Sequence, residues 1–260
     1  MNTLYLKHLL VATPLEPLAH RVRHWLGASK RRANPELREI HLEEGRIHEA
    51  MARLVREDSN CIDVGAHIGS TLSQLISLAP RGQHWAFEAV EEKAGWLRKK
   101  FPKVTVKHLA LTDSEGEIVF HVNLSRPGYS GIHNQGDDKD QWTEVVVPTA
   151  PLDAVIPADT PIHFIKIDVE GAEAVVLKGA RELLARSRPA ILFESAPRPE
   201  DPAGDERRVL FDLLTSYGYG VYFVKDYLEG GDPTTWERFD ASHQYPFQAL
   251  NYLALPKAEE

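Results

Sequence analysis

The sequence contains one cysteine, Cys61, among its 260 residues. A single cysteine excludes an internal disulfide, and its place in an apolar run favours a small buried side chain over a nucleophile. No hydrophobic run approaches the roughly 20 residues that a membrane-spanning helix needs. The apolar start of the chain lacks the basic stretch that precedes the core of a signal peptide. These absences predict a cytoplasmic protein without a membrane span.

Positive charge is also scarce. The chain has 30 lysine and arginine residues against 38 aspartate and glutamate residues, which gives a formal net charge of −8. Nucleic-acid-binding domains are usually basic, so this balance predicts no nucleic-acid partner and weakly disfavours polyanionic substrates. The hydrophobic content of 43% is ample for a core.

The length of 260 residues suits one large α/β domain with a modest extension. Apolar residues at helical spacing predict a helix over 14–26 and a longer one from Pro35 to Val55. We therefore expect an N-terminal helical extension over 1–57, which is a candidate dimer or lid element, and a main domain over 58–260.

The most informative stretch is Cys61-Ile-Asp-Val-Gly-Ala-His-Ile-Gly-Ser70. Its first four residues predict a buried parallel strand, and residues 71–78 predict a helix. Gly65 and Gly69 stand between the two. Strand, glycine turn and helix open a nucleotide-binding βαβ unit, because glycine lets a ligand approach the backbone and the helix start offers free N–H groups.

One glycine expected of a dinucleotide site is missing. A dinucleotide fingerprint reads Gly-x-Gly-x-x-Gly, and its second glycine makes room for a pyrophosphate; here His67 fills that place. Asp63 precedes the turn, and Glu88 ends the next predicted strand, where an acid can bind both ribose hydroxyls of an adenosine. This combination favours S-adenosylmethionine, which carries no phosphate, over a dinucleotide.

Strands and helices alternate along the rest of the chain. The pattern predicts seven core strands, over residues 61–64, 84–88, 104–110, 162–168, 189–194, 220–224 and 250–255. Helices are expected over 91–100, 172–186 and 205–217. An exposed antiparallel strand is expected over 117–122, and a further strand over 142–147. The alternation predicts a doubly wound, mostly parallel α/β sheet of Rossmann type with right-handed crossovers.

Four acidic residues stand at the carboxyl ends of predicted strands: Asp63, Glu88, Asp168 and Glu194. In open α/β sheets, ligands bind outside these ends. The acids are therefore expected to surround one site. Leu111 and Asp113 follow the third core strand, where an apolar wall and a polar side chain can hold adenine.

Five short segments follow one another along the chain: residues 63–69, 87–88, 109–116, 164–173 and 192–195. Together they resemble the FkbM family of S-adenosylmethionine-dependent methyltransferases, over about residues 34–225. The resemblance implies a class I methyltransferase sheet with a reversed last strand. It also implies methyl transfer to a hydroxyl of a polyketide, sugar or other small metabolite. The family often has asparagine where this chain has His67, so the role of His67 stays open.

Methyl transfer needs the acceptor aligned with the methyl group, and an alcohol acceptor must also lose its proton to a base or with the help of a metal. We rank Asp168 and Glu170 first as catalytic residues, followed by Glu194 and by His133 in the long loop 125–141. A metal site of Asp168, Glu194 and a histidine is conceivable, but the spacing of the histidines does not support it, and no metal is predicted. N-methylation, which needs no strong base, stays open.

The predicted cofactor-binding residues are Asp63, Gly65, His67, Gly69, Glu88, Leu111, Asp113 and Asp168. Two other functions remain as alternatives to a methyltransferase. One is an NAD-dependent oxidoreductase or epimerase on a similar sheet, and the other is a nucleotide-binding module without catalytic activity.

Overall fold

The computed structural model describes residues 13, 33–126, 130–132, 140–198, 201 and 203–257 of the chain. The helix expected over 14–26 and the candidate base His133 lie outside these residues. Among the described residues, no helix is both long and apolar enough to cross a bilayer.

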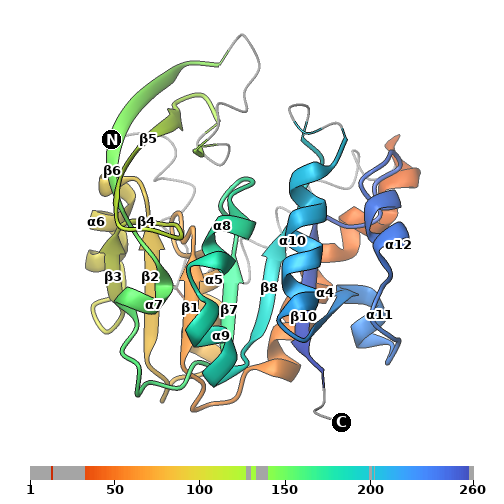
Figure 1. Ribbon diagram of the computed structural model, residues 1–260, viewed down its shortest axis with the longest axis horizontal. Helices are drawn as coiled ribbons and strands as arrows, with labels where there is room; N and C mark the ends of the chain where they lie inside the picture. Colours follow the sequence, from red (N-terminus) through yellow and green to blue (C-terminus); the bar gives the residue numbers. More distant parts are fainter. Residues whose placement is uncertain are drawn as a thin grey trace.

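A seven-stranded sheet in the order β3-β2-β1-β7-β8-β10-β9 forms the centre of the molecule (Figure 1). Its strands are β1 (Cys61–Val64), β2 (His84–Glu88), β3 (Thr105–His108), β7 (Phe164–Ile167), β8 (Ala190–Glu194), β9 (Tyr219–Phe223) and β10 (Asn251–Pro256). β10 runs in the direction opposite to the other six strands, and it pairs antiparallel with both β8 and β9. The predicted doubly wound sheet with a reversed last strand is therefore confirmed.

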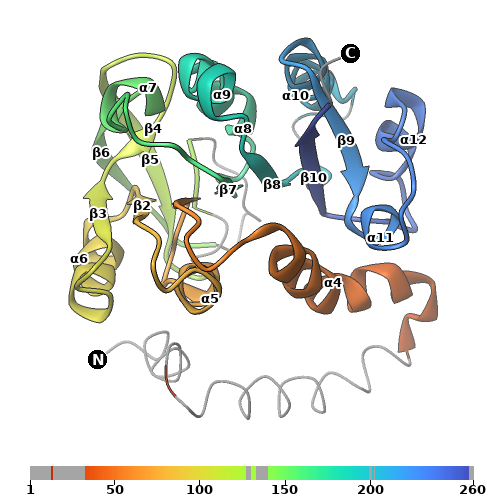
Figure 2. The ribbon, with the colours of Figure 1, turned by 90° about the horizontal axis from the view of Figure 1, so that it is seen from below.

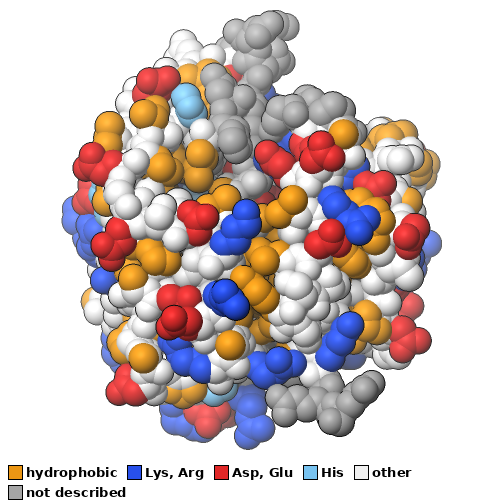
Figure 3. All heavy atoms as spheres, viewed as in Figure 1, with side chains coloured by type: hydrophobic (Ala, Val, Ile, Leu, Met, Phe, Trp, Pro, Cys, Tyr) orange, Lys and Arg blue, Asp and Glu red, His pale blue; other side chains and the backbone are white. Residues whose placement is uncertain are grey.

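Helices cover both faces of the sheet (Figure 2). One face carries α4 (Arg38–Leu54), α5 (Ser70–Leu78) and α6 (Glu91–Lys100), and the other carries α8 (Glu173–Lys178), α9 (Arg181–Ser187) and α10 (Asp205–Ser216). The remaining helical segments are η1 (Pro35–Leu37), α7 (Leu152–Val155), α11 (Val224–Leu228) and α12 (Trp236–Ala241). Because helices cover both faces, β1, β2 and β7 are buried along their whole length. Acidic and basic side chains are interspersed on the face that carries α8, α9 and α10 (Figure 3).

Helix α4 belongs to the segment expected to be an extension, and it packs directly on the sheet. Ala50 and Met51 are buried in a cluster that includes Phe164 of β7. Glu43 is also buried, and its Oε1 accepts hydrogen bonds from the backbone N–H groups of Leu250 and Asn251 at 2.8 and 3.0 Å. Helix α4 is thereby tied to the start of β10.

A smaller sheet is inserted between β3 and β7. It consists of β4 (Ala110–Leu111), β5 (Gly116–Asn123) and β6 (Trp142–Ala150), in the order β4-β6-β5. The two long strands pair antiparallel with each other, and an antiparallel strand was expected at the position of β5, whereas β4 pairs parallel with the end of β6. The strand predicted over 104–110 is thus divided, and its last residue belongs to this smaller sheet.

The continuous helix predicted over 172–186 is wrong. The structure has two helices there, α8 and α9, separated at Gly179 and Ala180. A Cβ at Gly179 would lie only 2.0 Å from the backbone oxygen of Thr112, which follows β4. This close approach between two backbones requires a glycine at the break, although the apolar spacing of the sequence continues through it.

Candidate functional site

A cavity of about 320 Å³ opens at the carboxyl ends of β1, β2 and β7. Its wall includes seven of the residues predicted for the site: Gly65, His67, Glu88, Leu111, Asp168, Glu170 and Glu194. The smaller sheet adds Phe120, and Ser130 and Ile132 of the following segment also line the cavity. The carboxyl ends of adjacent parallel strands lie side by side at one edge of the sheet, which explains how residues so far apart in the sequence meet here.

The turn after β1 is shaped by close packing. Gly65 has φ 74°, and a Cβ there would lie 1.8 Å from the backbone oxygen of Asp168. The turn therefore rests directly on the end of β7. His67 also has a positive φ, 51°, which costs about 1 kcal/mol or more for a residue with a side chain. This conformation points the His67 N–H at Glu88.

Glu88 is held by the backbone. Its Oε2 accepts a hydrogen bond from the N–H of His67 at 2.8 Å, and its Oε1 accepts one from the N–H of Val90 at 2.9 Å. Burial raises the pKa of this carboxyl group, and the nearby Lys93 ammonium and the two N–H donors oppose that rise. A carboxylate has about four lone-pair positions, so each oxygen of Glu88 can accept one further hydrogen bond.

Lys166 of β7 joins two acids beneath and beside the cavity. Its side chain is only 9% exposed, and its Nζ lies 2.8 Å from Oδ2 of Asp168 and 3.9 Å from Oδ1 of Asp63. Asp63 is fully buried, and burial raises its pKa to about 6 although Lys166 opposes the shift. The ammonium is therefore the positive charge that offsets these two carboxylates.

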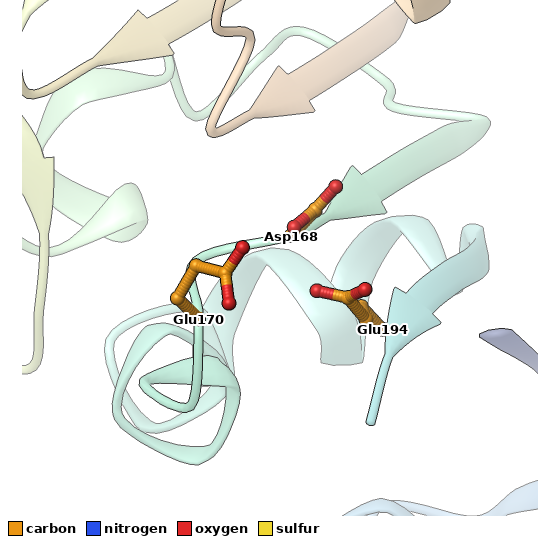
Figure 4. A group of neighbouring side chains, drawn as sticks. All are labelled: Asp168, Glu170 and Glu194. Carbon is orange, nitrogen blue, oxygen red and sulfur yellow. The ribbon is translucent and has the colours of Figure 1, made fainter. Parts of the chain in front are cut away.

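Three carboxyl groups, including that of Asp168, lie close together at the ends of β7 and β8. Ligand atoms of Asp168, Glu170 and Glu194 all lie within 4.8 Å of one another, and Figure 4 shows their carboxyl groups pointing toward a common space. Glu170 has φ 53°, so the turn that follows β7 carries a second residue with a side chain in the left-handed region. The strained backbone places its carboxyl group beside the other two.

The three acids titrate differently. Burial would raise the pKa of Asp168, but the Lys166 ammonium and hydrogen bonds outweigh it, and the pKa lies below its usual range. Burial, reinforced by the negative charges of Asp168 and Glu173, raises the pKa of Glu170 to about 8. Burial and the charges of Asp168 and Glu170 raise the pKa of Glu194 well above its ordinary value. The group therefore combines one acid whose pKa is lowered, Asp168, with two whose pKa is raised, Glu170 and Glu194.

Grouped carboxyl oxygens of this kind can also take up a hard cation such as Mg²⁺. The sequence predicted no metal here, and acidic groups are common without one. Lys166 supplies a positive charge 2.8 Å from Asp168, and the absence of a metal stays a prediction from the sequence.

Three predicted cofactor residues lie outside the cavity wall. Asp63 is buried in β1. Gly69, with φ 87°, begins α5, and a Cβ there would lie 2.4 Å from the ring of Phe101. Asp113 is exposed in the turn after β4. For these residues the predicted contact with a cofactor stays a prediction.

The sequence pattern did not single out several residues that the structure places at the site. Lys166 is the one charged residue in an otherwise apolar strand, and this was the feature of the sequence that could have indicated a role for it at the site. Lys93 of α6 also lines the cavity. Ser195 is hydrogen-bonded to His243, 48 residues further along the chain, at 2.9 Å. No spacing in the sequence predicts that pair.

Residues 63–221, more than half of the chain, match the methyltransferase FkbM domain. The chain belongs to the FkbM methyltransferase family. The matched region begins at Asp63 and ends in β9, so it includes every strand that contributes a carboxyl group to the cavity.

The individual methyltransferases that match this chain share a quarter or less of its residues. It is 25% identical over 198 residues to the 2-O-methyltransferase NoeI of Sinorhizobium fredii, covering 69% of this chain and 81% of NoeI. The structure of a methyltransferase FkbM from Methylobacillus flagellatus matches with 18% identity and a TM-score of 0.48, covering 77% of this chain and 44% of the other. The chain thus spans less than half of that protein.

The structure of an O-methyltransferase from Bacillus cereus, in complex with SAH, matches with 15% identity and a TM-score of 0.45, covering 82% of this chain and 80% of the other. At TM-scores below 0.5 such likenesses are loose, and the family assignment rests on the match to the FkbM domain.

Proposed function

We propose that this protein transfers a methyl group from S-adenosylmethionine to a hydroxyl group of a small metabolite. The observation that carries the proposal is a single cavity bordered by Glu88 on β2 and by the carboxyl groups at the ends of β7 and β8. Between β2 and β8 there are three strand spacings, about 14 Å. This span suits a cofactor with a nucleoside at one end and a reactive group at the other.

The residues present fit this cofactor. Glu88 has lone pairs available for two ribose hydroxyls, and the buried side chains of Leu111 and Phe87 offer an apolar surface to the adenine. The carboxyl cluster around Asp168 suits positive charge. His67 occupies the place where a dinucleotide would need bare backbone for its pyrophosphate, which counts against the NAD-dependent alternative.

When bound, S-adenosylmethionine supplies a methyl group attached to a positively charged sulfur. The chain's own residues must orient the acceptor hydroxyl and remove its proton. Glu170 is suited to accept that proton, because a pKa raised to about 8 gives its ionised form a greater proton affinity than an ordinary carboxylate has. Asp168, which stays ionised, stabilises nearby positive charge. A base in this position supports an oxygen acceptor, since an amine acceptor needs none, and the similarity to the 2-O-methyltransferase NoeI agrees with it.

Calorimetric titration with S-adenosylhomocysteine and, separately, with NAD tests the proposal. We expect micromolar binding of S-adenosylhomocysteine alone. Glu88→Gln should weaken it about tenfold, because one charged acceptor is lost, and Glu115→Gln, an exposed substitution in the turn after β4, should leave it unchanged. Binding of NAD without S-adenosylhomocysteine would refute the proposed function.

A further inference from the structure

The turn that follows β7 carries the proposed base in an uncommon backbone conformation. Glu170 has φ 53° and Gly171 has φ 98°, so two consecutive residues lie in the left-handed region. For a residue with a side chain this costs about 1 kcal/mol or more, and it persists only where neighbouring groups hold the backbone in place. The groups that hold this turn therefore decide where the Glu170 carboxyl group points.

Glu173, the first residue of α8, binds the backbone of this turn. Its Oε1 accepts hydrogen bonds from the N–H groups of Val169 and Gly171, at 3.2 and 3.1 Å. These two N–H groups flank Glu170. Turns in which neighbouring N–H groups converge form concavities that bind anions, and here a carboxyl group of the chain itself fills the concavity. The two bonds close the turn on either side of Glu170.

Other contacts fix the two ends of the turn. The N–H of Asp168 donates to the backbone oxygen of Val64 in β1 at 3.1 Å. A Cβ at Gly171 would lie 1.7 Å from Nη1 of Arg198, so the guanidinium group is in contact with the glycine, and it is held in turn by an ion pair with α10. Because both ends are fixed in this way, Glu173 controls the peptide units between them.

Glu173 is placed differently from an acid that serves only a helix start. An acid in the first turn can complement the helix dipole from an exposed position, and Glu182 stands exposed in the first turn of α9. Glu173 is only 5% exposed. Burial raises its pKa, and the backbone N–H donors oppose that rise. A buried carboxyl group needs such donors, so Glu173 and the turn stabilise each other.

We propose that Glu173 is the positioning residue for Glu170: by binding the N–H groups on both sides of it, Glu173 keeps the Glu170 carboxyl group beside those of Asp168 and Glu194 (Figure 4). The inference rests on the proposed function, in which Glu170 accepts the proton of the acceptor. Glu173 lies outside the wall of the first cavity, so it acts through the backbone of the turn.

Three substitutions separate this role from that of a helix-dipole acid. Glu173→Asp keeps the charge but shortens the side chain by one carbon–carbon bond, about 1.5 Å, so its oxygens no longer reach the turn. Glu173→Gln removes the charge but keeps an oxygen that can accept from both N–H groups. Glu173→Met removes every acceptor at similar length. Glu182→Asp, on α9, is the matched control.

Amide hydrogen exchange, followed by NMR on the full chain, measures the two N–H groups directly. Exchange at Val169 and Gly171 should be at least about tenfold faster in Glu173→Asp and Glu173→Met, because a hydrogen bond is lost. It should stay close to that of the unmodified protein in Glu173→Gln and Glu182→Asp. Protection that survives in Glu173→Asp, or that is lost in Glu173→Gln, overturns the inference. Glu173→Asp decides the matter if Glu173→Met does not fold.

The position of Glu170 is measured by titrating its carboxyl carbon in ¹³C NMR, with the signal assigned by its absence from Glu170→Gln. Burial is the main cause that raises the pKa of Glu170 to about 8, so a carboxyl group that leaves the cluster should titrate at least about one pH unit lower in Glu173→Asp. An unchanged titration there overturns the inference. The other charged groups that act on Glu170 are the same in every variant: Asp168 and Lys166 of β7, Glu194 of β8, Lys93 of α6 and Arg198 after β8.

Calorimetric titration of the same samples with S-adenosylhomocysteine keeps the two proposals apart. The Kd should stay within about twofold in every Glu173 variant, because the side chain lies outside the first cavity. A tenfold loss in Glu173→Asp would show that the whole site is disturbed and would overturn the inference. Failure of the unmodified protein to bind S-adenosylhomocysteine is a different result, which overturns the proposed function and with it the role of Glu170 as a base.

Discussion

Glu88 and Glu194 are acids at the ends of strands in the same sheet, but their surroundings differ. Glu88 accepts hydrogen bonds from two backbone N–H groups, at 2.8 and 2.9 Å. Glu194 instead faces Asp168 and Glu170, which are themselves acids. Backbone donors neither titrate nor rotate away, so the β2 end is a fixed binding surface. At the β7 and β8 ends the charge depends on protons and on Lys166, which suits a region where a proton must move.

The largest expected effect comes from removing the cation that the acidic region depends on. Lys166→Met should lower the free energy of unfolding by about 3–5 kcal/mol, because a buried ion pair is broken while its acids remain. Urea denaturation measures the change. Adding Asp63→Asn to this variant should recover part of the loss.

Lys178→Met is the matched control for Lys166→Met, since Lys178 is exposed on α8. It should change the free energy of unfolding by no more than about 0.5 kcal/mol. If Lys166→Met lowered the free energy of unfolding by less than about 1 kcal/mol, the acids at the ends of β7 and β8 would not depend on Lys166, and the proposed difference from the β2 end would be wrong.

A smaller effect is expected on the pH dependence of the reaction. A general base acts in its ionised form, so the methyl-transfer rate should rise with pH through about 8, the pKa of Glu170, and level off above it. Glu170→Gln should remove this rise and lower the rate above pH 8 about 100-fold. Initial rates with an acceptor found by screening measure both, with exposed Glu182→Gln as the control. An unchanged profile in Glu170→Gln would exclude Glu170 as the base.

The smallest effect tests the fixed end of the site. Asp113→Ala should change the Kd for S-adenosylhomocysteine by less than about twofold, because an exposed side chain away from the cavity contributes little. Leu111→Ala, at a buried position in the cavity wall, should weaken binding more, since apolar contact is lost. A tenfold loss in Asp113→Ala would instead support the contact with adenine predicted from the sequence.

The sequence predicted the main sheet well because parallel strands buried on both faces have a strong pattern. Asp63, Glu88, Asp168 and Glu194 stand at or near the carboxyl ends of such strands. Because those ends lie at one edge of the sheet, three of the acids reach one cavity. That reasoning uses only local patterns and a general rule of sheet topology.

What the sequence could not predict depends on contacts between distant segments. Gly179 fits a helical pattern, and only the structure shows that the backbone oxygen of Thr112 leaves no room for a Cβ there. The partnership of Ser195 with His243 joins residues from two different parts of the chain. The low pKa of Asp168 likewise depends on Lys166, whose side-chain direction no periodicity specifies.

The smaller sheet has a consequence for how members of such a fold can diverge. The chain leaves the main framework at Leu111 and returns at Ala150, and these two residues are paired neighbours in β4 and β6. A different segment could therefore join them without changing the order of the main strands, provided that the backbone at Thr112 still fits against Gly179. Because the present segment contributes Phe120, Ser130 and Ile132 to the cavity, recombination at two adjacent points would remodel one wall and leave the carboxyl groups in place.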